Sequence, residues 1–376
     1  MGGAILTMRR RKSKMCFHLE IFIMPSSRDA ARGNDSANLD VLRSIAVLMV
    51  LFDHLCRHFH HDRVLGLGVV DWGTFGVLLF FVHTSLVLMS SMQRSSLRGI
   101  DLVKNFYIRR FFRIYPLSIL AVLTAVGLHL HAAGRGLAFG PRPQALEFIS
   151  NLFLIQNLTY SDSIIGPLWS LPIEVQMYLI LPAFFLWRKR SVWALIMLWA
   201  IFGFLGHWPQ VIPALGWFTL LLYVPNFLPG IMAFTLRRRP VFPSWLWGFF
   251  VLLLGVAYCL LPGRRMGGFL CLLLGLAIPL FREIQFSPLK VSGKWIATYS
   301  YGIYLAHSFC IWCGLTVFHS WVLFWILMTT TPVLLYHGLE QPAIRLGIRL
   351  ANRASAQVAP KQLAAVPQTS LETELS

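Results

Sequence analysis

The chain has 376 residues, of which 56% are hydrophobic and only 13% are charged, and its formal net charge is +18. A soluble domain carries roughly a quarter charged residues, so this composition excludes an ordinary soluble protein and indicates a membrane protein. The positive charge does not indicate nucleic-acid binding, because Lys and Arg sit in short clusters between apolar runs.

The first predicted region is a basic extension over residues 1–37. The cluster Arg9–Lys14 precedes an apolar stretch that is short and is interrupted by Glu20. Such a stretch is neither a membrane span nor a good signal peptide. We therefore expect a disordered segment on the cytoplasmic side.

Ten apolar runs then follow in residues 38–345, and a span needs roughly 17 to 25 mainly apolar residues. Most of the 33 Lys and Arg residues fall in alternate loops, which is typical of the cytoplasmic side and places both termini there. The sequence thus predicts an all-α, polytopic membrane protein with about ten transmembrane helices. These helices are expected near 39–57, 72–92, 111–132, 167–187, 191–206, 211–235, 243–261, 266–281, 295–314 and 319–337.

Two further segments complete the chain-order prediction. Residues 144–158 are apolar but interrupted by polar residues, which indicates an interfacial helix or loop. Residues 346–376 are polar and are expected to form a disordered tail.

Ionisable side chains occur inside several predicted spans, where they are costly unless they face a partner or a water-filled cavity. Arg43 and His54 lie on one face of the first helix, about 16 Å apart along its axis. Asp53 precedes His54 but points roughly 100° away from it. These residues are functional candidates. A structural alternative is that Asp40 pairs with Arg43.

The other helices add polar residues at comparable depths. Glu174 lies near the outer start of the fourth helix, and His83 lies near the middle of the second. The ninth helix carries Ser300, Tyr304 and His307 on one face. Several titratable groups are therefore expected to converge, although Glu174 paired with a histidine could also serve only to hold helices together.

Two arginines mark the start of the third helix. Arg110 and Arg113 are three positions apart and share a face, and paired guanidinium groups suit phosphate or carboxylate. Arg109 is better explained by topology or lipid headgroup contact. No metal site is predicted: Cys310 and Cys313 lie in an apolar run, where Cys packs as a small hydrophobe.

An ordered set of motifs resembles membrane acyltransferase family 3. The first helix has the family pattern of Arg43, ten residues, then His54. The remaining matches are Phe80-Phe81-Val82, Arg110 and Arg113 with Ile114-Tyr115-Pro116, Pro167-Leu168-Trp169-Ser170-Leu171 with Glu174 and Tyr178, Ser300 to His307, and Glu340-Gln341-Pro342. Where many members have Ser-Gly after the Phe-Phe-Val motif, this chain has His83-Thr84-Ser85.

The resemblance implies a bacterial inner-membrane enzyme that moves an acyl group, often acetyl, from acetyl-CoA or another acyl-CoA to a glycan or other hydroxyl-bearing acceptor. It implies that the arginine–histidine pair of the first helix and the arginine pair of the third are essential. On this basis Arg43, Arg110 and Arg113 are expected to bind the donor, although Arg43 could instead bind Asp40. We expect no hydrolase-like domain fused at the C-terminus, and therefore a separate periplasmic partner or direct transfer.

For the chemistry, His54 is predicted to act as a general base, since imidazole titrates near neutral pH. Transient acylation of His54 is the competing version. Glu174 is the preferred residue to orient His54, and Asp53 and His307 are the alternatives. The rival function is a proton-coupled transporter that uses the buried His and Glu residues as a relay.

Overall fold

The computed structural model describes residues 36–133, 136–187, 191–205, 219–236, 240–261 and 263–356. Most of these residues are helical, which confirms the all-α prediction. The long helices are α1 (Ala37–His58), α2 (Val69–Gln93), α3 (Gly99–Gly127), α6 (Leu171–Leu186), α7 (Val192–Leu205), α8 (Thr219–Thr235), α9 (Leu246–Leu260), α10 (Arg264–Ala277), α11 (Ser287–Ile311), α12 (Trp321–Leu335) and α13 (Gln341–Ala356).

Short segments connect the long helices. They include two antiparallel hairpins, in which β1 pairs with β2 and β3 with β4. The segment predicted as an interfacial helix or loop, 144–158, contains α4 and α5. The short segments are β1 (Arg63–Val64), β2 (Leu67–Gly68), β3 (Leu130–Ala133), β4 (Gly136–Phe139), α4 (Ala145–Phe153), α5 (Gln156–Thr159), η2 (Gly166–Ser170), η4 (Ile278–Leu280), η5 (Trp312–Val317) and η6 (Tyr336–Glu340).

Long apolar helices dominate the described part of the chain. Within it, four helical segments are long and apolar enough to cross a membrane, namely Val69–Gln93, Gly99–Gly127, Gly166–Leu186 and Trp321–Ala354. Helices α7, α8 and α9 are apolar but shorter, as is Met266–Leu280. The number of ten spans and the cytoplasmic position of both termini stay predictions.

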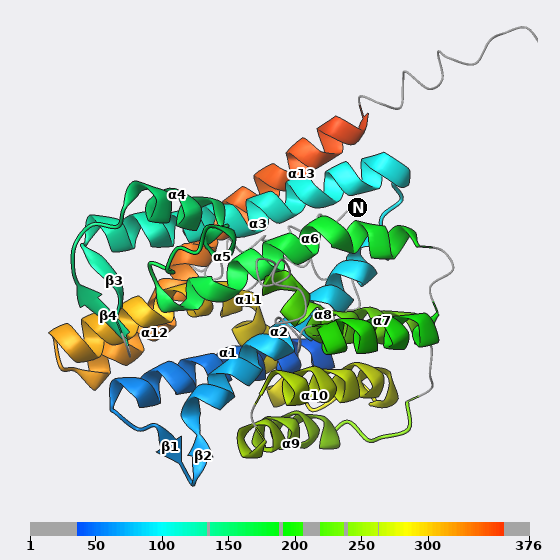
Figure 1. Cartoon of the computed structure of the whole chain (residues 1–376), viewed down its shortest axis with the longest axis horizontal. Coiled ribbons are helices and arrows are strands. Elements are labelled where there is room, and N and C mark those ends of the chain that lie inside the picture. Colours follow the sequence, from blue (N-terminus) through cyan, green and yellow to red (C-terminus); the bar gives the residue numbers. More distant parts are fainter. Residues whose placement is uncertain are drawn as a thin grey trace, which may run out of the picture. The chain divides into compact units, whose positions relative to one another are not determined.

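Two helices extend beyond their predicted ends. Helix α3 begins at Gly99, earlier than the predicted 111, because the polar turns before residue 111 continue the same helix. Helix α13 includes residues 346–356, which the sequence assigned to the tail. It packs along α3 (Figure 1). Ala351 is buried there, and Gly347 lies against Phe112. Residues 1–35 and 357–376 of the two predicted terminal segments lie outside the described residues.

Helix α1 packs against both α2 and α11 (Figure 1). Gly76 of α2 allows a close approach of the two backbones, since a Cβ atom there would lie 2.6 Å from the Ala46 carbonyl oxygen of α1. On the other side, Ser44 Oγ donates a hydrogen bond to the Gly293 carbonyl oxygen of α11 at 2.8 Å. These contacts fix which face of α1 points into the helix bundle.

The start of α1 is anchored by Asn38, whose side chain is buried. Asn38 Nδ2 donates to the Arg282 carbonyl oxygen at 3.1 Å, and Asn38 Oδ1 accepts from the Ile284 backbone N–H at 3.1 Å. Trp247 Nε1 donates to the Asn38 carbonyl oxygen at 2.8 Å. Since the polar groups of a buried side chain must be satisfied internally, this network holds α1 in register with the segment that leads into α11.

Candidate active site

Three arginines meet in one cavity, here called the arginine cavity. It is lined by Arg43 of α1, Arg110 and Arg113 of α3, Glu174 of α6 and Ser300 of α11, among others. Its volume is about 90 Å³, smaller than the sites of drug-sized ligands, so it can hold only part of a large molecule. The structure therefore brings together the three arginines that the sequence singled out.

Two of the three arginines have well-defined partners. Arg43 Nε donates to Ser300 Oγ at 2.6 Å. Arg113 forms an ion pair with Glu340 and lies over the ring of Tyr301, 5.8 Å from its centroid. Such contacts lock long side chains in place, so little conformational entropy remains to be lost when a ligand binds.

Two carboxylates face this cluster of cations. Glu174 accepts hydrogen bonds from the Tyr178 hydroxyl and from Thr84 Oγ1, the second at 3.3 Å. Glu340 belongs to the short π-helical segment η6, and its side chain is only 1% exposed. Three guanidinium groups against two carboxylates leave a surplus of positive charge, which favours an anionic ligand group.

A second cavity, here called the histidine cavity, surrounds His54. Its lining includes Asp53, His54, Arg57, Trp169 and Tyr304, and its volume is about 220 Å³. His54 lies three helical turns from Arg43, so the two residues are about 16 Å apart along α1. Both cavities are lined by residues from several helices of the bundle.

The tautomer of His54 follows from its neighbours. His54 Nδ1 lies 2.9 Å from the Val50 carbonyl oxygen, and a carbonyl can only accept, so Nδ1 carries the proton. The other ring nitrogen, Nε2, then keeps its lone pair and faces Gly166, where a Cβ atom would lie 3.6 Å away. His54 is thus prepared to accept a proton at Nε2.

A second histidine contacts His54. The rings of His54 and His307 meet edge to face, with centroids 4.6 Å apart. His307 Nδ1 lies 3.2 Å from the Ile303 carbonyl oxygen, which gives it the same tautomer, and its Nε2 is buried without a hydrogen-bond partner in the described structure. The structure therefore joins these two predicted residues.

The carboxylate beside His54 is that of Asp53, 3.6 Å from Nδ1. Asp53 is held by Arg57, whose Nε lies 2.7 Å from Oδ1 and whose Nη2 donates to Oδ2 at 3.0 Å. Gly73 of α2 leaves room for this carboxylate, because a Cβ atom there would meet it. Glu174, which the sequence favoured as the partner of His54, lies instead in the arginine cavity.

Sequence reasoning missed several residues. Arg57 was not singled out, although it stands four positions after Asp53 on the same helix, a spacing that by itself indicates an ion pair. Glu340 was only part of a motif match. Among the described residues no group of three His, Cys, Asp or Glu is placed to hold a metal ion.

The fold and these cavities define a multi-pass helical membrane protein with polar sites inside the bundle. A family model described as an acyltransferase domain matches residues 36–336, which is most of the chain. The chain therefore belongs to this acyltransferase family, which confirms the predicted membership and favours an enzyme over a transporter.

Several curated proteins are similar to the chain. The peptidoglycan O-acetyltransferase OatA of Listeria monocytogenes is 31% identical over 205 residues, which cover 51% of this chain and 30% of the relative. Nodulation protein 10 of Rhizobium leguminosarum is 27% identical over 185 residues (44% and 49%), and acyltransferase MdmB of Streptomyces mycarofaciens is 32% identical over 168 residues (42% and 42%). The chain thus spans less than half the length of these relatives. No solved structure matches it significantly.

Proposed function

We propose that the protein is an O-acetyltransferase that moves an acetyl group from a cytoplasmic acyl-CoA to a hydroxyl group of a glycan. The observation that carries this proposal is the pairing of a cationic cavity with a histidine cavity along one helix, α1. Support for acetyl transfer comes from relatives named as O-acetyltransferases.

The donor is bound at the arginine cavity. Its phosphates contact Arg110 and Arg113, since guanidinium groups bind phosphate with two parallel hydrogen bonds. Arg43, which Ser300 holds on one side, contributes a third positive charge. The acyl-bearing arm extends along α1 toward His54, a distance of about 16 Å.

The transfer step takes place in the histidine cavity. His54 Nε2 accepts the proton of the acceptor hydroxyl while the hydroxyl oxygen forms a bond to the thioester carbon. The carbon–sulfur bond then breaks, and the protonated His54 returns the proton to the departing thiolate. His54 is thereby regenerated, and the products are the ester and the free thiol. In the competing version His54 Nε2 attacks the thioester carbon and the carbon–sulfur bond breaks to release the thiolate. The acceptor oxygen then bonds to the acyl carbon as the carbon–nitrogen bond to His54 breaks, and the thiolate takes the hydroxyl proton.

The proposed setting is the bacterial inner membrane, with ten spans and both termini in the cytoplasm. Lys and Arg clusters in alternate loops support that orientation. A glycan acceptor, supplied directly or through a separate periplasmic partner, approaches from the opposite side. Reporter fusions at residues 62 and 290 provide a test: the first must report the periplasm and the second the cytoplasm.

The function is tested by mass spectrometry of surface glycans from cells with the wild-type protein, with His54→Ala and with no protein. We expect a fixed mass increase of one acetyl group per modified sugar in the wild type alone. Identical spectra in all three strains would overturn the proposal. Rapid acid quenching of the protein after addition of acetyl-CoA separates the two chemical versions, because only the competing version leaves an acetyl group on His54.

A further inference from the structure

The arginine cavity and the histidine cavity share two lining residues, Val77 of α2 and Tyr304 of α11. The arginines line the arginine cavity, whereas Asp53, His54 and Arg57 line the histidine cavity. Val77 and Tyr304 therefore form the wall between the cavities.

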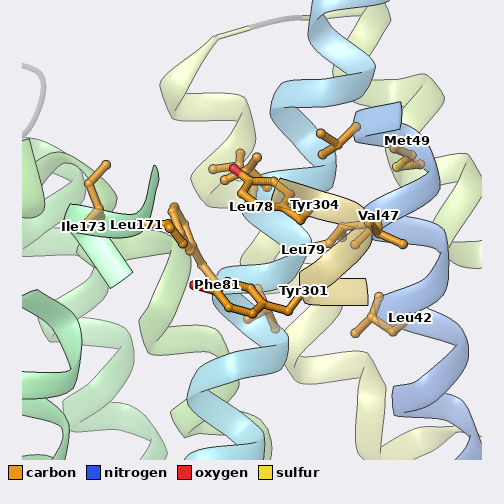
Figure 2. Packing of buried hydrophobic residues seen from close by; sticks show 14 of the residues in the cluster. Leu42, Val47, Met49, Leu78, Leu79, Phe81, Leu171, Ile173, Tyr301 and Tyr304 are labelled. Carbon is orange, nitrogen blue, oxygen red and sulfur yellow. The ribbon is translucent and has the colours of Figure 1, made fainter. Parts of the chain in front are cut away.

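Tyr304 is fixed within this wall. Its hydroxyl donates to the Pro167 carbonyl oxygen at 2.8 Å and is hydrogen-bonded to Ser170 Oγ at 2.7 Å. Pro167 lines the histidine cavity and Ser170 lines the arginine cavity, so η2 runs across the same boundary. Figure 2 shows Tyr304 and Tyr301 projecting from α11 among hydrophobic residues of α1 and α2.

Val77 completes the wall from the opposite helix. Its side chain is 4% exposed and belongs to the same hydrophobic core as Tyr304. Neither residue carries a charge, so the wall provides no electrostatic attraction for a donor. The wall can therefore distinguish passing groups only by their shape. Packed protein interiors respond to changes as small as one methyl group.

The role of this wall rests on the proposed function. A donor held by Arg110 and Arg113 can deliver its acyl group to His54 only across the wall. A linear acyl group on a thioester arm has the cross-section of one methylene chain, whereas an acyl group branched next to the carbonyl is wider. We infer that Val77 and Tyr304 form the acyl passage and select linear acyl groups, such as acetyl, over branched ones. The two residues therefore determine donor specificity.

The test compares two donors, acetyl-CoA and isobutyryl-CoA, each labelled in the acyl group. Membranes that contain the full-length protein receive one donor, and label in their glycan fraction is measured. Val77→Ala widens the passage and is expected to raise the isobutyryl-to-acetyl rate ratio by about tenfold or more, the range that one methylene in a fitted pocket provides. Val77→Thr keeps the branched shape and should leave the ratio unchanged.

Two matched variants make the test specific. Val87→Ala removes the same atoms from the arginine cavity alone, and Val70→Ala removes them from the histidine cavity alone. Neither should raise the ratio. The acyl passage is refuted if Val87→Ala or Val70→Ala raises the rate ratio as much as Val77→Ala does, or if Val77→Ala leaves the ratio unchanged. The proposed function still stands in either case. If wild-type membranes transfer neither acyl group, the proposed function fails and the passage fails with it.

Discussion

The arginine cavity and the histidine cavity differ in how their charges are balanced. In the arginine cavity, guanidinium groups from α1 and α3 outnumber the carboxylates, which come from α6 and η6. In the histidine cavity, Asp53 and Arg57 neutralise one another within a single helix. Because of this difference, the arginine cavity suits an anionic ligand group, whereas the histidine cavity suits a neutral hydroxyl beside an uncharged imidazole.

The largest expected effect is on the chemical step. His54→Ala removes the group that accepts the hydroxyl proton and should lower kcat by roughly 100- to 10,000-fold, the usual contribution of general acid–base catalysis. The apparent KM for the donor should stay unchanged, because the arginine cavity is intact. His61→Ala, an exposed residue of the following loop, is the matched control and should keep full activity. Wild-type kcat in His54→Ala would remove His54 from the reaction.

The next effect is on stability. Glu340→Ala leaves Arg113, whose side chain is 19% exposed, without its carboxylate partner, and should lower the free energy of unfolding by about 3–5 kcal/mol. Thermal unfolding in detergent provides the measurement. In an Arg113→Ala background the same change should cost much less, because the partner is already absent. Equal costs in both backgrounds would show that the ion pair does not stabilise the fold.

A smaller effect is expected on donor binding. Arg110→Ala should raise the apparent KM for acyl-CoA by roughly 10- to 100-fold, since a hydrogen bond to a charged group contributes about 1.5–3 kcal/mol. The kcat at saturating donor should change little. Arg109→Ala provides the control, because Arg109 is exposed on the same turn of α3. If Arg109→Ala and Arg110→Ala raise KM equally, the positive charges act on the membrane surface and not in the cavity.

The smallest effect concerns Asp53. Asp53→Asn should lower kcat by less than about tenfold, far below the roughly 10,000-fold loss seen when the carboxylate of a catalytic triad is removed. The reason is geometric: the Val50 carbonyl lies 2.9 Å from His54 Nδ1, whereas the Asp53 carboxylate lies 3.6 Å away. A loss of a thousandfold or more in steady-state assays would instead make Asp53 the residue that orients His54.

Much of the site was predictable because it depends on helix periodicity. The spacing of Arg43 and His54 fixed their shared face, and the spacing of Arg110 and Arg113 did the same on α3. The rotation of one helix relative to another does not follow from periodicity. For this reason Glu174 was expected beside His54, whereas its carboxylate contacts Tyr178 and Thr84.

The ends of some helices depend on local backbone changes that hydrophobic patterning does not predict. The last predicted helix ended at residue 337, but η6 continues it with π-helical geometry and directs Glu340 toward Arg113. The end of the first helix agrees more closely, since it was predicted at residue 57 and α1 ends at His58. Hydrophobic patterning locates a helix well and its last turn poorly.

The central claim is that the acyl group enters at the arginine cavity and leaves at the histidine cavity. Purified protein in sealed vesicles tests this directly, with labelled acetyl-CoA supplied on one face and the glycan fraction on the other. We predict transfer only when the donor is on the face nearer Arg110 and Arg113, and none with His54→Ala. Equal transfer from both faces, or transfer that persists without His54, would contradict the account.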